Sequence, residues 1–527
     1  MTPEGGHWAK SRRIDTRIVV EGDLVLTSPA HFGGGAEDAG ADLALLRDER
    51  EGRALLSGAS IAGALRNYWR ERTFGYGALE DEAELFGVPR ESEEGEQSLL
   101  VVEDAIGSAP RVELRNGVAI NGATRTAADE KLFSMQVLCV GTRFPLRFEL
   151  VVPHGREAEL CRDLAVALDG LTRGEIALGS RKRRGFGACR VESWRVRRYD
   201  LTTTDGLLAW LAAGRSPAPW ESAPSEEEPG WPEAARVAAA EPAALPEMLG
   251  LTAGAELPDL RATFALRATF SLQSSLLVRS GTARADLGVD MVQLRRRSAG
   301  GEPAAPEPVL PGTSLAGALR FRALRIANAL SPDDSRSAAL VGTMFGVGPD
   351  APGMSSAASR LVVQEACLTG VHSLVQHRIR VDRFTGGALD RFLFTEAPVF
   401  ADDGAEGIAD DEAGGNLVVD LELRAPTDAE IGLLLLLLKD LWIGDLPLGG
   451  EAGAGRGRLR GIHATLTRRL PGEGATRWHL EDKDGRLEVS SGAPIKPDGG
   501  ARALDPPREQ LQRYVAALHA HLQGGQG

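Results

Sequence analysis

Apolar and polar residues alternate along several short segments of the chain, and the first of these, residues 17–27 (RIVVEGDLVLT), predicts a half-buried strand. Residues 60–72 predict a helix, because Ala, Leu and Arg favour helix and Ser60 is suited to an N-cap. After an apolar strand at residues 99–105 and an irregular insert, we expect a strand at 142–152, a helix at 157–171 and a strand at 188–194. This order predicts an α+β domain of the ferredoxin-like (RRM-like, split βαβ) type.

The second half of the chain repeats the same order of elements. Strands are expected at 260–272, 360–366, 416–423 and 456–467, helices at 314–330 and 428–441, and the insert at 372–400. Between the halves, residues 203–258 are rich in Pro, Ala, Glu and Trp, which predicts a linker with some local helix. The tail ends in a candidate amphipathic helix, residues 507–523, which we expect to dock through its apolar face.

Two repeated segments indicate that the halves are copies of one another. LLSGASIAGALR at residues 55–66 returns as VLPGTSLAGALR at 309–320, an offset of 254 positions (309 − 55). LGSRKRRGFG at 178–187 pairs with LGGEAGAGRG at 448–457, an offset of 270 (448 − 178). The sequence therefore predicts a tandem duplication: a first domain (14–200), a linker (201–258), a second domain (259–470) and a C-terminal tail (471–527).

Length, cysteine use and hydropathy narrow the class of protein. The chain has 527 residues and 43% hydrophobic content, enough for two domains with cores of their own. Its four cysteines lie far apart without a CxxC pair, so neither a disulfide framework nor a structural zinc site is indicated. The N-terminus has no apolar signal core and the apolar stretch 431–438 is too short to span a bilayer. We expect a cytoplasmic protein that does not enter a membrane.

The formal net charge of −14 argues at first against a nucleic-acid partner. The acidic residues, however, concentrate in expected loops and linkers at 80–96, 221–228 and 402–412. Arginine clusters beside the repeated motifs, and arginine is suited to bidentate contacts with phosphate. Two interpretations stay open here: an RNA-binding surface, or solvated charged faces that balance the acidic loops.

Several motifs together resemble those of the RAMP superfamily, specifically the backbone subunits of type III CRISPR effector complexes. They are the PGTSLAGALR helix at 311–320, LFG at 85–87, VDRFTGGA at 381–388, LFTE at 393–396 and GAGRGRL at 453–459. The first copy is looser: INGATRTA at 120–127 departs from the pattern, and Ser134–Met135 stand where Thr395–Glu396 stand in the second. The resemblance covers both copies, as expected for a two-copy fusion.

The resemblance implies a ferredoxin-like palm in each copy with an inserted thumb hairpin, expected at 118–140 and 372–400. It also implies binding to a CRISPR guide RNA, a complementary target RNA and other CRISPR effector subunits. In this family the thumbs displace target nucleotides at regular intervals, and a nearby loop aspartate cuts the target RNA. The chain is therefore expected to be an endoribonuclease within a ribonucleoprotein complex.

The resemblance places the catalytic aspartates at Asp42, in GADLALLRD, and Asp290, in GVDMVQLRR. A carboxylate suits RNA cleavage because the 2′-hydroxyl is an internal nucleophile that needs orientation and proton transfer. The family implies Mg²⁺ or another divalent cation, held by Asp42 or Asp290 together with RNA phosphates. The alternative is that each is an ordinary loop acid or Asx turn. The nearest misassignments are Asp38 and Asp286, each four residues upstream.

Candidate RNA-binding residues lie at the starts of the repeated helices, in the second insert and in the glycine-rich loops. They are Ser60, Arg66, Arg181, Lys182, Arg183, Arg184, Ser314, Arg320, Arg383, Arg456 and Arg458. For the serines, capping and core packing are equally good explanations. Phenylalanines in the thumbs could stack on bases or simply anchor the hairpins: Phe133, Phe384 and Phe394. His31 could assist in the first copy, with only Ser275 near the same place in the second.

Three functions follow from these observations. The first is a guide-RNA-binding backbone subunit that also cuts target RNA at two sites, at Asp42 and Asp290. The second is a non-catalytic RNA-binding backbone subunit, to which the divergent first thumb is well suited. The third is a guide-RNA processing nuclease, which the large insert at 372–400 disfavours because such enzymes lack large thumbs and generally use histidine.

Overall fold

We describe a computed structural model of the chain. The structure describes residues 13–34, 41–78, 84–87, 97–108, 111–120, 127–213, 236–240, 242–280, 288–298, 305–348, 355–402, 415–472, 474–483, 486–491 and 506–524. The candidate misassignments Asp38 and Asp286 lie outside these residues. Within the described part, no helix is long and apolar enough to cross a membrane.

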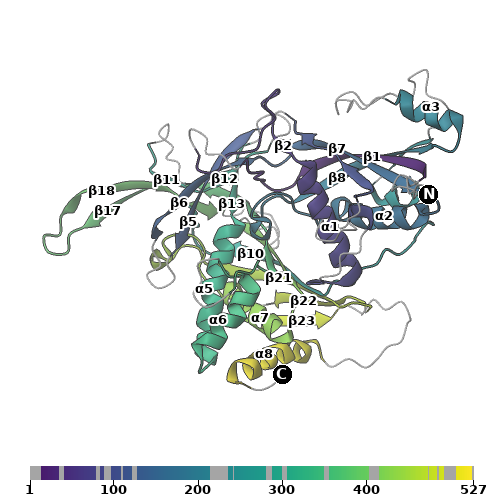
Figure 1. The fold of residues 1–527 in the computed structure, drawn as a ribbon. Coiled ribbons are helices and arrows are strands. Elements are labelled where there is room, and N and C mark those ends of the chain that lie inside the picture. Colours follow the sequence, from purple (N-terminus) through teal and green to yellow (C-terminus); the bar gives the residue numbers. More distant parts are fainter. Residues whose placement is uncertain are drawn as a thin grey trace, which may run out of the picture.

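The first domain is a five-stranded antiparallel sheet with helices on one face (Figure 1). Its strand order is β3-β7-β1-β8-β9. The strands are β1 (Ile14–Leu26), β3 (Leu100–Val102), β7 (Arg143–Pro153), β8 (Cys189–Asp200) and β9 (Arg236–Ala240), and the helices are α1 (Gly58–Phe74) and α2 (Glu157–Thr172). In chain order, the four main strands lie as second, third, first and fourth, which is the ferredoxin-like arrangement.

The second domain repeats this arrangement around a larger sheet. Its central strands are β14 (Leu361–Val363) and β15 (Ala366–Thr369), β20 (Asn416–Arg424), β10 (Thr263–Leu272) and β21 (Leu459–Arg469). At one edge β13 (Glu307–Leu310) and β12 (Arg295–Arg296) extend the sheet, and at the other β22 (Thr476–Lys483) and β23 (Arg486–Ser491) do so. The helices are α5 (Gly312–Leu330), α6 (Asp334–Phe345) and α7 (Asp428–Trp442). The α+β, two-domain ferredoxin-like prediction is confirmed.

Segments outside the two repeats also pack on the domains. The stretch expected to be a linker contains α3 (Thr204–Ala212), β9 and α4 (Leu245–Met248), and β9 pairs with β8. In the tail, α8 (Pro507–Gln523) packs on α7 through buried Leu511, Tyr514 and Leu518. An amphipathic helix is stable here because its apolar stripe leaves water. The four domain boundaries predicted from the sequence stay a prediction.

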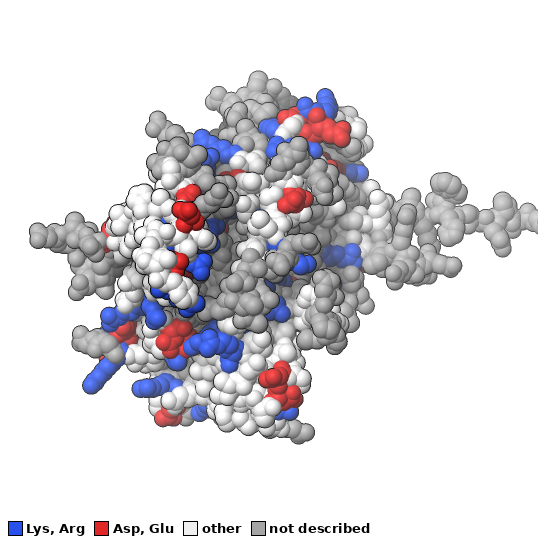
Figure 2. All heavy atoms as spheres, turned by 90° about the vertical axis from the view of Figure 1, so that its left-hand side faces the viewer, with Lys and Arg blue, Asp and Glu red and all other residues white. Residues whose placement is uncertain are grey.

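Each domain carries an inserted hairpin between its second and third main strands. The first thumb is β5 (Val112–Ile120) with β6 (Ala127–Leu138), and the second thumb is β17 (Gln376–Val381) with β18 (Ala388–Ala397). Further short pairings lie at the bases: β2 (Leu55–Leu56) with β4 (Ala105–Ile106), β16 (Val371–Ser373) with β19 (Val399–Ala401), and β11 (Met291–Val292) beside β18. The second thumb projects from the body (Figure 1). Figure 2 faces that side and shows groups of basic side chains with acidic side chains among them.

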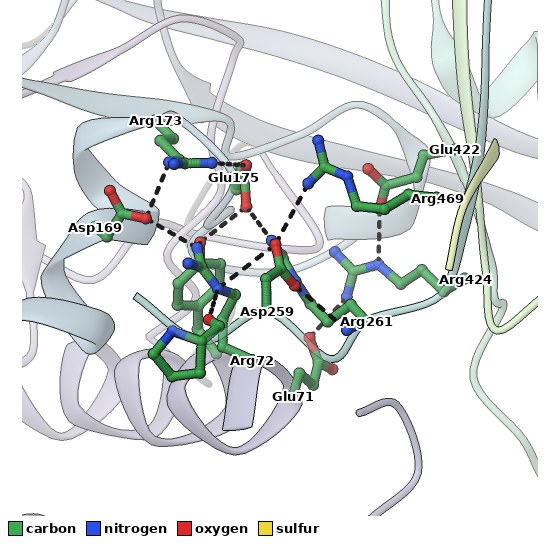
Figure 3. A network of polar contacts seen from close by, with 12 residues as sticks. Glu71, Arg72, Asp169, Arg173, Glu175, Asp259, Arg261, Glu422, Arg424 and Arg469 are labelled. Atoms are coloured by element: carbon green, nitrogen blue, oxygen red, sulfur yellow. Dashed lines mark hydrogen bonds and ion pairs between the residues drawn. The ribbon is translucent and has the colours of Figure 1, made fainter. Parts of the chain in front are cut away.

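The two domains meet at a cluster of charged side chains, which we call the joint (Figure 3). Arg72 of α1 is 2% exposed and donates hydrogen bonds to Asp169 (2.8 Å) and to the Pro258 carbonyl (2.7 Å). Asp259 pairs with Arg261 and, across the boundary, with Arg469 of β21 (3.3 Å). The other members are Glu71, Arg173, Glu175, Glu422 and Arg424. Because buried charges require partners, the joint holds the domains in one orientation.

Candidate functional site

Asp42 lies at the base of the first thumb, and its carboxylate is hydrogen-bonded to Ser134 of strand β6. The backbone N–H of Ser134 donates to Oδ2 of Asp42 (2.7 Å), and the Ser134 hydroxyl donates to the same oxygen (3.1 Å). In the other direction, the backbone N–H of Asp42 donates to Ser134 Oγ (3.1 Å). These hydrogen bonds lower the pKa of Asp42, so its exposed carboxylate is ionised at neutral pH.

Asp290 occupies the same place at the base of the second thumb. The backbone N–H of Thr395 in β18 donates to Oδ2 of Asp290 (2.9 Å), and the N–H of Asp290 donates to the Thr395 carbonyl (3.0 Å). The following residues pair in parallel in both copies: Leu43 with Met135, and Met291 with Glu396. The alignment of the two aspartates is therefore confirmed in space, and their catalytic role stays a prediction.

In each copy a histidine contacts the thumb strand that binds the aspartate, but it comes from a different element. In the second copy, Nδ1 of His377 lies 3.1 Å from Oγ1 of Thr395, the residue whose N–H binds Asp290. His377 is not predicted from the sequence, because only the pairing of β17 with β18 brings it to the site. In the first copy, His31 is buried with Nδ1 2.7 Å from the Gln136 carbonyl.

The structure corrects the expected counterpart of His31. The carbonyl of His31 accepts from the N–H of Ser180 (3.0 Å), and the carbonyl of Leu277 accepts from the N–H of Gly450 (2.8 Å). Leu277 is therefore the equivalent residue. Ser275 instead matches Pro29, since each carbonyl accepts from the last glycine of its own glycine loop. The second copy has no histidine at this position.

The described residues do not form a metal site by themselves. They include no group of three or more His, Cys, Asp or Glu side chains that could hold a metal ion. Each centre offers one carboxylate, and one of its oxygens already accepts a hydrogen bond from the thumb strand. Since Mg²⁺ takes about six oxygen ligands, this donor set does not fit a site built by the protein alone.

The first glycine loop (178–187) brings four positive charges to the boundary between the domains. Its 3-10 turn, Lys182–Arg184, packs against β14 and the start of α5, and Arg184 donates to the Phe345 carbonyl (3.0 Å). None of the four, Arg181, Lys182, Arg183 and Arg184, pairs with a carboxylate among the described residues. Partial burial and the nearby charges of Arg320 and Arg181 lower the pKa of Arg184. Such uncompensated charge favours an anion.

The two serines expected at the starts of the repeated helices, Ser60 and Ser314, are not the N-cap residues. Helix α1 begins at Gly58 with Ser57 as its N-cap, and Ser60 lies in the first turn with its N–H donating to Ser57 Oγ (3.3 Å). Helix α5 begins at Gly312 after Pro311, so Ser314 is not a cap either. Arg66 is half-buried and Arg320 is exposed, two turns into their helices.

The second glycine loop (448–457) differs from the first in its charged residues, which are Glu451 and Arg456 in place of four basic side chains. Arg456 is 2% exposed and pairs with Glu396 of β18 (2.8 Å) and with Glu451 (3.0 Å). It therefore does not present its charge to solvent, and the expected contact with RNA does not fit this position. Arg458 is exposed and donates to the Gly444 carbonyl (3.3 Å), so it is the accessible cation of this loop.

The thumb phenylalanines differ in exposure. Phe384 is 86% exposed in the turn of the second thumb, with the exposed Arg383 guanidinium 5.3 Å from its ring. Phe394 is half-buried in β18. Phe133 is half-buried, and the guanidinium of Arg181 lies 4.4 Å from its ring centre. Phe384 is therefore free to stack on a base, whereas Phe133 links the first thumb to the first glycine loop.

A comparison with protein families matches both copies, and a search of curated proteins finds no match. The model of the RAMP superfamily matches residues 23–190 and 295–460. The two matched regions contain Asp42, both glycine loops and both thumbs, and the second begins just after Asp290. They cover more than half of the chain and each falls on one ferredoxin-like domain. The chain therefore belongs to the RAMP superfamily, with one copy of the family domain in each half.

Proposed function

We propose that this protein is a guide-RNA-binding backbone subunit of a type III CRISPR interference complex that cuts complementary target RNA at two sites. One observation carries the proposal: in both copies a loop aspartate is bound side-on to the equivalent residue of the thumb strand. The contact is present in both copies although the residue that makes it differs, Ser134 in the first and Thr395 in the second. Family membership supports the RNA-binding, CRISPR-associated context.

The proposed reaction uses the RNA's own nucleophile. The 2′-oxygen attacks the adjacent phosphorus, the bond from phosphorus to the 5′-oxygen breaks, and the products are a 2′,3′-cyclic phosphate and a 5′-hydroxyl. Asp42 or Asp290, bound to its thumb strand, accepts a hydrogen bond from the 2′-hydroxyl, fixes it in line and passes its proton on to solvent. Solvent returns a proton to the leaving oxygen. A divalent cation at either centre would have Asp42 or Asp290 as its protein ligand, would take its remaining ligands from RNA phosphates and water, and would stabilise the charge that develops on the phosphate.

The test is to assemble the complex with a guide and map cuts in a bound, end-labelled target. We expect two cuts in the wild type and none with the double variant Asp42→Asn/Asp290→Asn, with target affinity unchanged. Cuts that persist in the double variant would show that the chemistry lies elsewhere.

A non-catalytic backbone subunit is the second candidate function. The absence of a three-ligand metal group among the described residues favours it, because a lone carboxylate is a modest catalyst. A wild-type complex that binds target RNA without cutting it would establish this alternative.

The first glycine loop should contribute directly to RNA affinity. We predict that Lys182→Ala/Arg183→Ala weakens guide binding at least about tenfold and lowers the slope of log K against log salt by about 1.4, about 0.7 for each lost phosphate contact. The measurement is a filter-binding titration at several salt concentrations. The matched control is Arg267→Ala/Arg460→Ala, which removes two exposed arginines already paired with Asp420 and Asp482. An equal loss in the control would mean that only net charge matters.

A further inference from the structure

Strand β18, which binds Asp290 through Thr395, also carries a buried acid, Glu396. Side chains alternate along β18, so Glu396 points to the opposite face from Thr395 and is 0% exposed. Its carboxylate lies 2.8 Å from Nη1 of Arg456 and 3.3 Å from Nε of Arg378. A buried carboxylate is tolerated only when cations compensate it, so these contacts determine where β18 can lie.

The same charges tie both thumb strands to the second glycine loop. Oε2 of Glu451 lies 3.0 Å from Arg456 and 3.1 Å from Arg378 of β17, while Arg456 also donates to Gln376 (2.9 Å). Glu451 itself has a φ of +59°, a strained conformation for a residue with a side chain. Burial and the neighbouring Glu396 carboxyl raise the pKa of Glu451. We call Arg378, Glu396, Glu451 and Arg456 the ionic clamp; Arg279 faces it from outside, 3.6 Å from Glu451.

The first copy has apolar residues at the positions of Glu396 and Arg456, next to a different buried arginine, Arg115, which pairs with Glu113 and Glu365. Met135 takes the place of Glu396, and Phe186 that of Arg456, and the two pack with Val137 and Phe133 in a small apolar cluster. Arg181 replaces Glu451 with the same backbone conformation, φ +56°. Buried ion pairs are often no more stable than apolar residues of similar volume. The fold therefore does not require the ionic clamp, and what the clamp shares with the apolar cluster is its place between the thumb strand and the glycine loop.

We propose that Glu396 and Arg456 are positioning residues for the second centre, which seat β18 on the glycine loop so that Thr395 holds Asp290. This inference rests on the proposed function of Asp290. The connection is short: Arg456 holds Glu396, Glu396 adjoins Thr395 in β18, and the Thr395 N–H binds the Asp290 carboxylate. A displacement of this strand moves the carboxylate relative to the RNA, and misplacement by about 1 Å can cost about 10²-fold in rate.

The two centres of one chain provide the control for each other. Arg456→Ala and Glu396→Gln should each slow the cut assigned to Asp290 at least about tenfold and leave the cut assigned to Asp42 at its wild-type rate. Arg460→Ala removes a cation four residues away, which is exposed and paired with Asp482 of β22, and should leave the Asp290 cut within about twofold. Equal slowing of both cuts, or of neither, would overturn the proposal.

A transplant of the first copy's residues separates positioning from folding. The variant Arg378→Gly/Glu396→Met/Glu451→Arg/Arg456→Phe places in the second copy the residues found at Gly117, Met135, Arg181 and Phe186. It should restore the Asp290 cut to within a few-fold of wild type, because an apolar cluster can seat the strand equally well. A folded transplant that does not cut at this site would show that the charges act in some other way.

Hydrogen exchange tests the seating independently of cleavage. In the unliganded chain, Arg456→Ala should speed amide exchange in peptides of β18, including the Thr395 N–H, and leave peptides of β6 unchanged. Unchanged exchange in β18 would overturn the proposal whatever the cutting assay shows. If Asp290→Ala leaves both cuts intact, the proposed function fails instead, and the exchange measurement still decides whether the ionic clamp seats the strand.

Discussion

Asp290→Ala is expected to abolish one of two target cuts while the other proceeds at its wild-type rate, and Asp42→Ala is expected to do the converse. Each carboxylate sits on its own thumb, bound to Thr395 or to Ser134, and neither contacts the other copy's thumb strand in the described structure. Loss of a group that orients the nucleophile and assists proton transfer typically costs about 10²–10⁴ in rate. The measurement is single-turnover cleavage of end-labelled target, resolved by product length.

The asparagine variants separate charge from geometry. An amide oxygen at residue 42 or 290 can still accept the thumb N–H, so Asp42→Asn and Asp290→Asn keep the loop in place and remove only the charge. They should lose nearly as much activity as the alanine variants. Asp48→Ala is the matched control, because Asp48 is a loop acid that accepts backbone N–H groups from Arg50 and Glu51. If Asp48→Ala slows a cut as much as Asp42→Ala, the assignment of Asp42 is wrong.

The sequence predicted the duplicated fold and the pairing of the two aspartates well. Both depend on local signals: period-two strands, helix-forming segments and a repeat that aligns distant positions. The strand order and the side-on contact of each aspartate with its thumb agree with that alignment. Duplication made this possible, because a pattern met twice at matching distances is more specific than either copy alone.

Helix starts were less predictable, as Ser60 illustrates. Ser57 and Ser60 are both suited to an N-cap, and local sequence does not separate them. Tertiary packing does: a Cβ at Gly58 would lie 2.2 Å from the Val102 carbonyl, so only glycine lets the helix start press against this strand. The helix consequently begins at Gly58, and Ser57 becomes the cap.

Arg456 shows why basic loops cannot be assigned to RNA from composition. By sequence it resembles the exposed cations of the first glycine loop. Its burial depends on Glu396, sixty positions earlier in the chain and on a different element. At the corresponding positions the first copy has an apolar pair, Phe186 and Met135. That both residues of the pair differ between the copies becomes apparent only when their contact is known. Likewise, His377 reaches the second centre only through strand pairing.

The joint escaped prediction although its central residues lie just after the expected linker. Asp259 is the first residue of the predicted second domain (259–470), and Arg261 falls in the strand expected at 260–272. In the structure they pair with each other and with residues of both domains, including Glu175 (2.7 Å from Arg261) and Arg469. Although burial alone would raise it, the pKa of Asp259 is lowered by Arg261 and Arg72. A folded pKa below the unfolded value means stability that is present above about pH 4 and lost as pH falls further.

Arg72→Ala is therefore expected to be the most destabilising single substitution at the joint, lowering the free energy of unfolding by about 3 kcal/mol. Arg72 is buried, and its removal takes one donor each from Asp169, the Tyr68 hydroxyl and the Pro258 carbonyl, while Asp169 keeps its pairing with Arg173. Urea unfolding followed by tryptophan fluorescence measures the change. Arg70→Ala is the matched control on the same helix, where a more exposed arginine hydrogen-bonds to Asn67, and should cost less than about 0.5 kcal/mol.

The number of steps in the unfolding transition, and their dependence on pH, also report on the joint. Because Arg72 bonds to α1, α2 and the segment that leads into the second domain, its loss should uncouple the domains as well as weaken the first. We expect the variant to unfold in two resolved steps where the wild type unfolds in one, with the first step less weakened by acid than the wild-type transition, because Asp259 has lost one of the cations that lower its pKa. A single transition with an unchanged midpoint would show that the joint contributes nothing to stability.

The distance between the two cuts on a long target provides a functional measure of the joint. If the joint sets the orientation of the domains, Arg72→Ala should broaden the distribution of this distance without removing either cut.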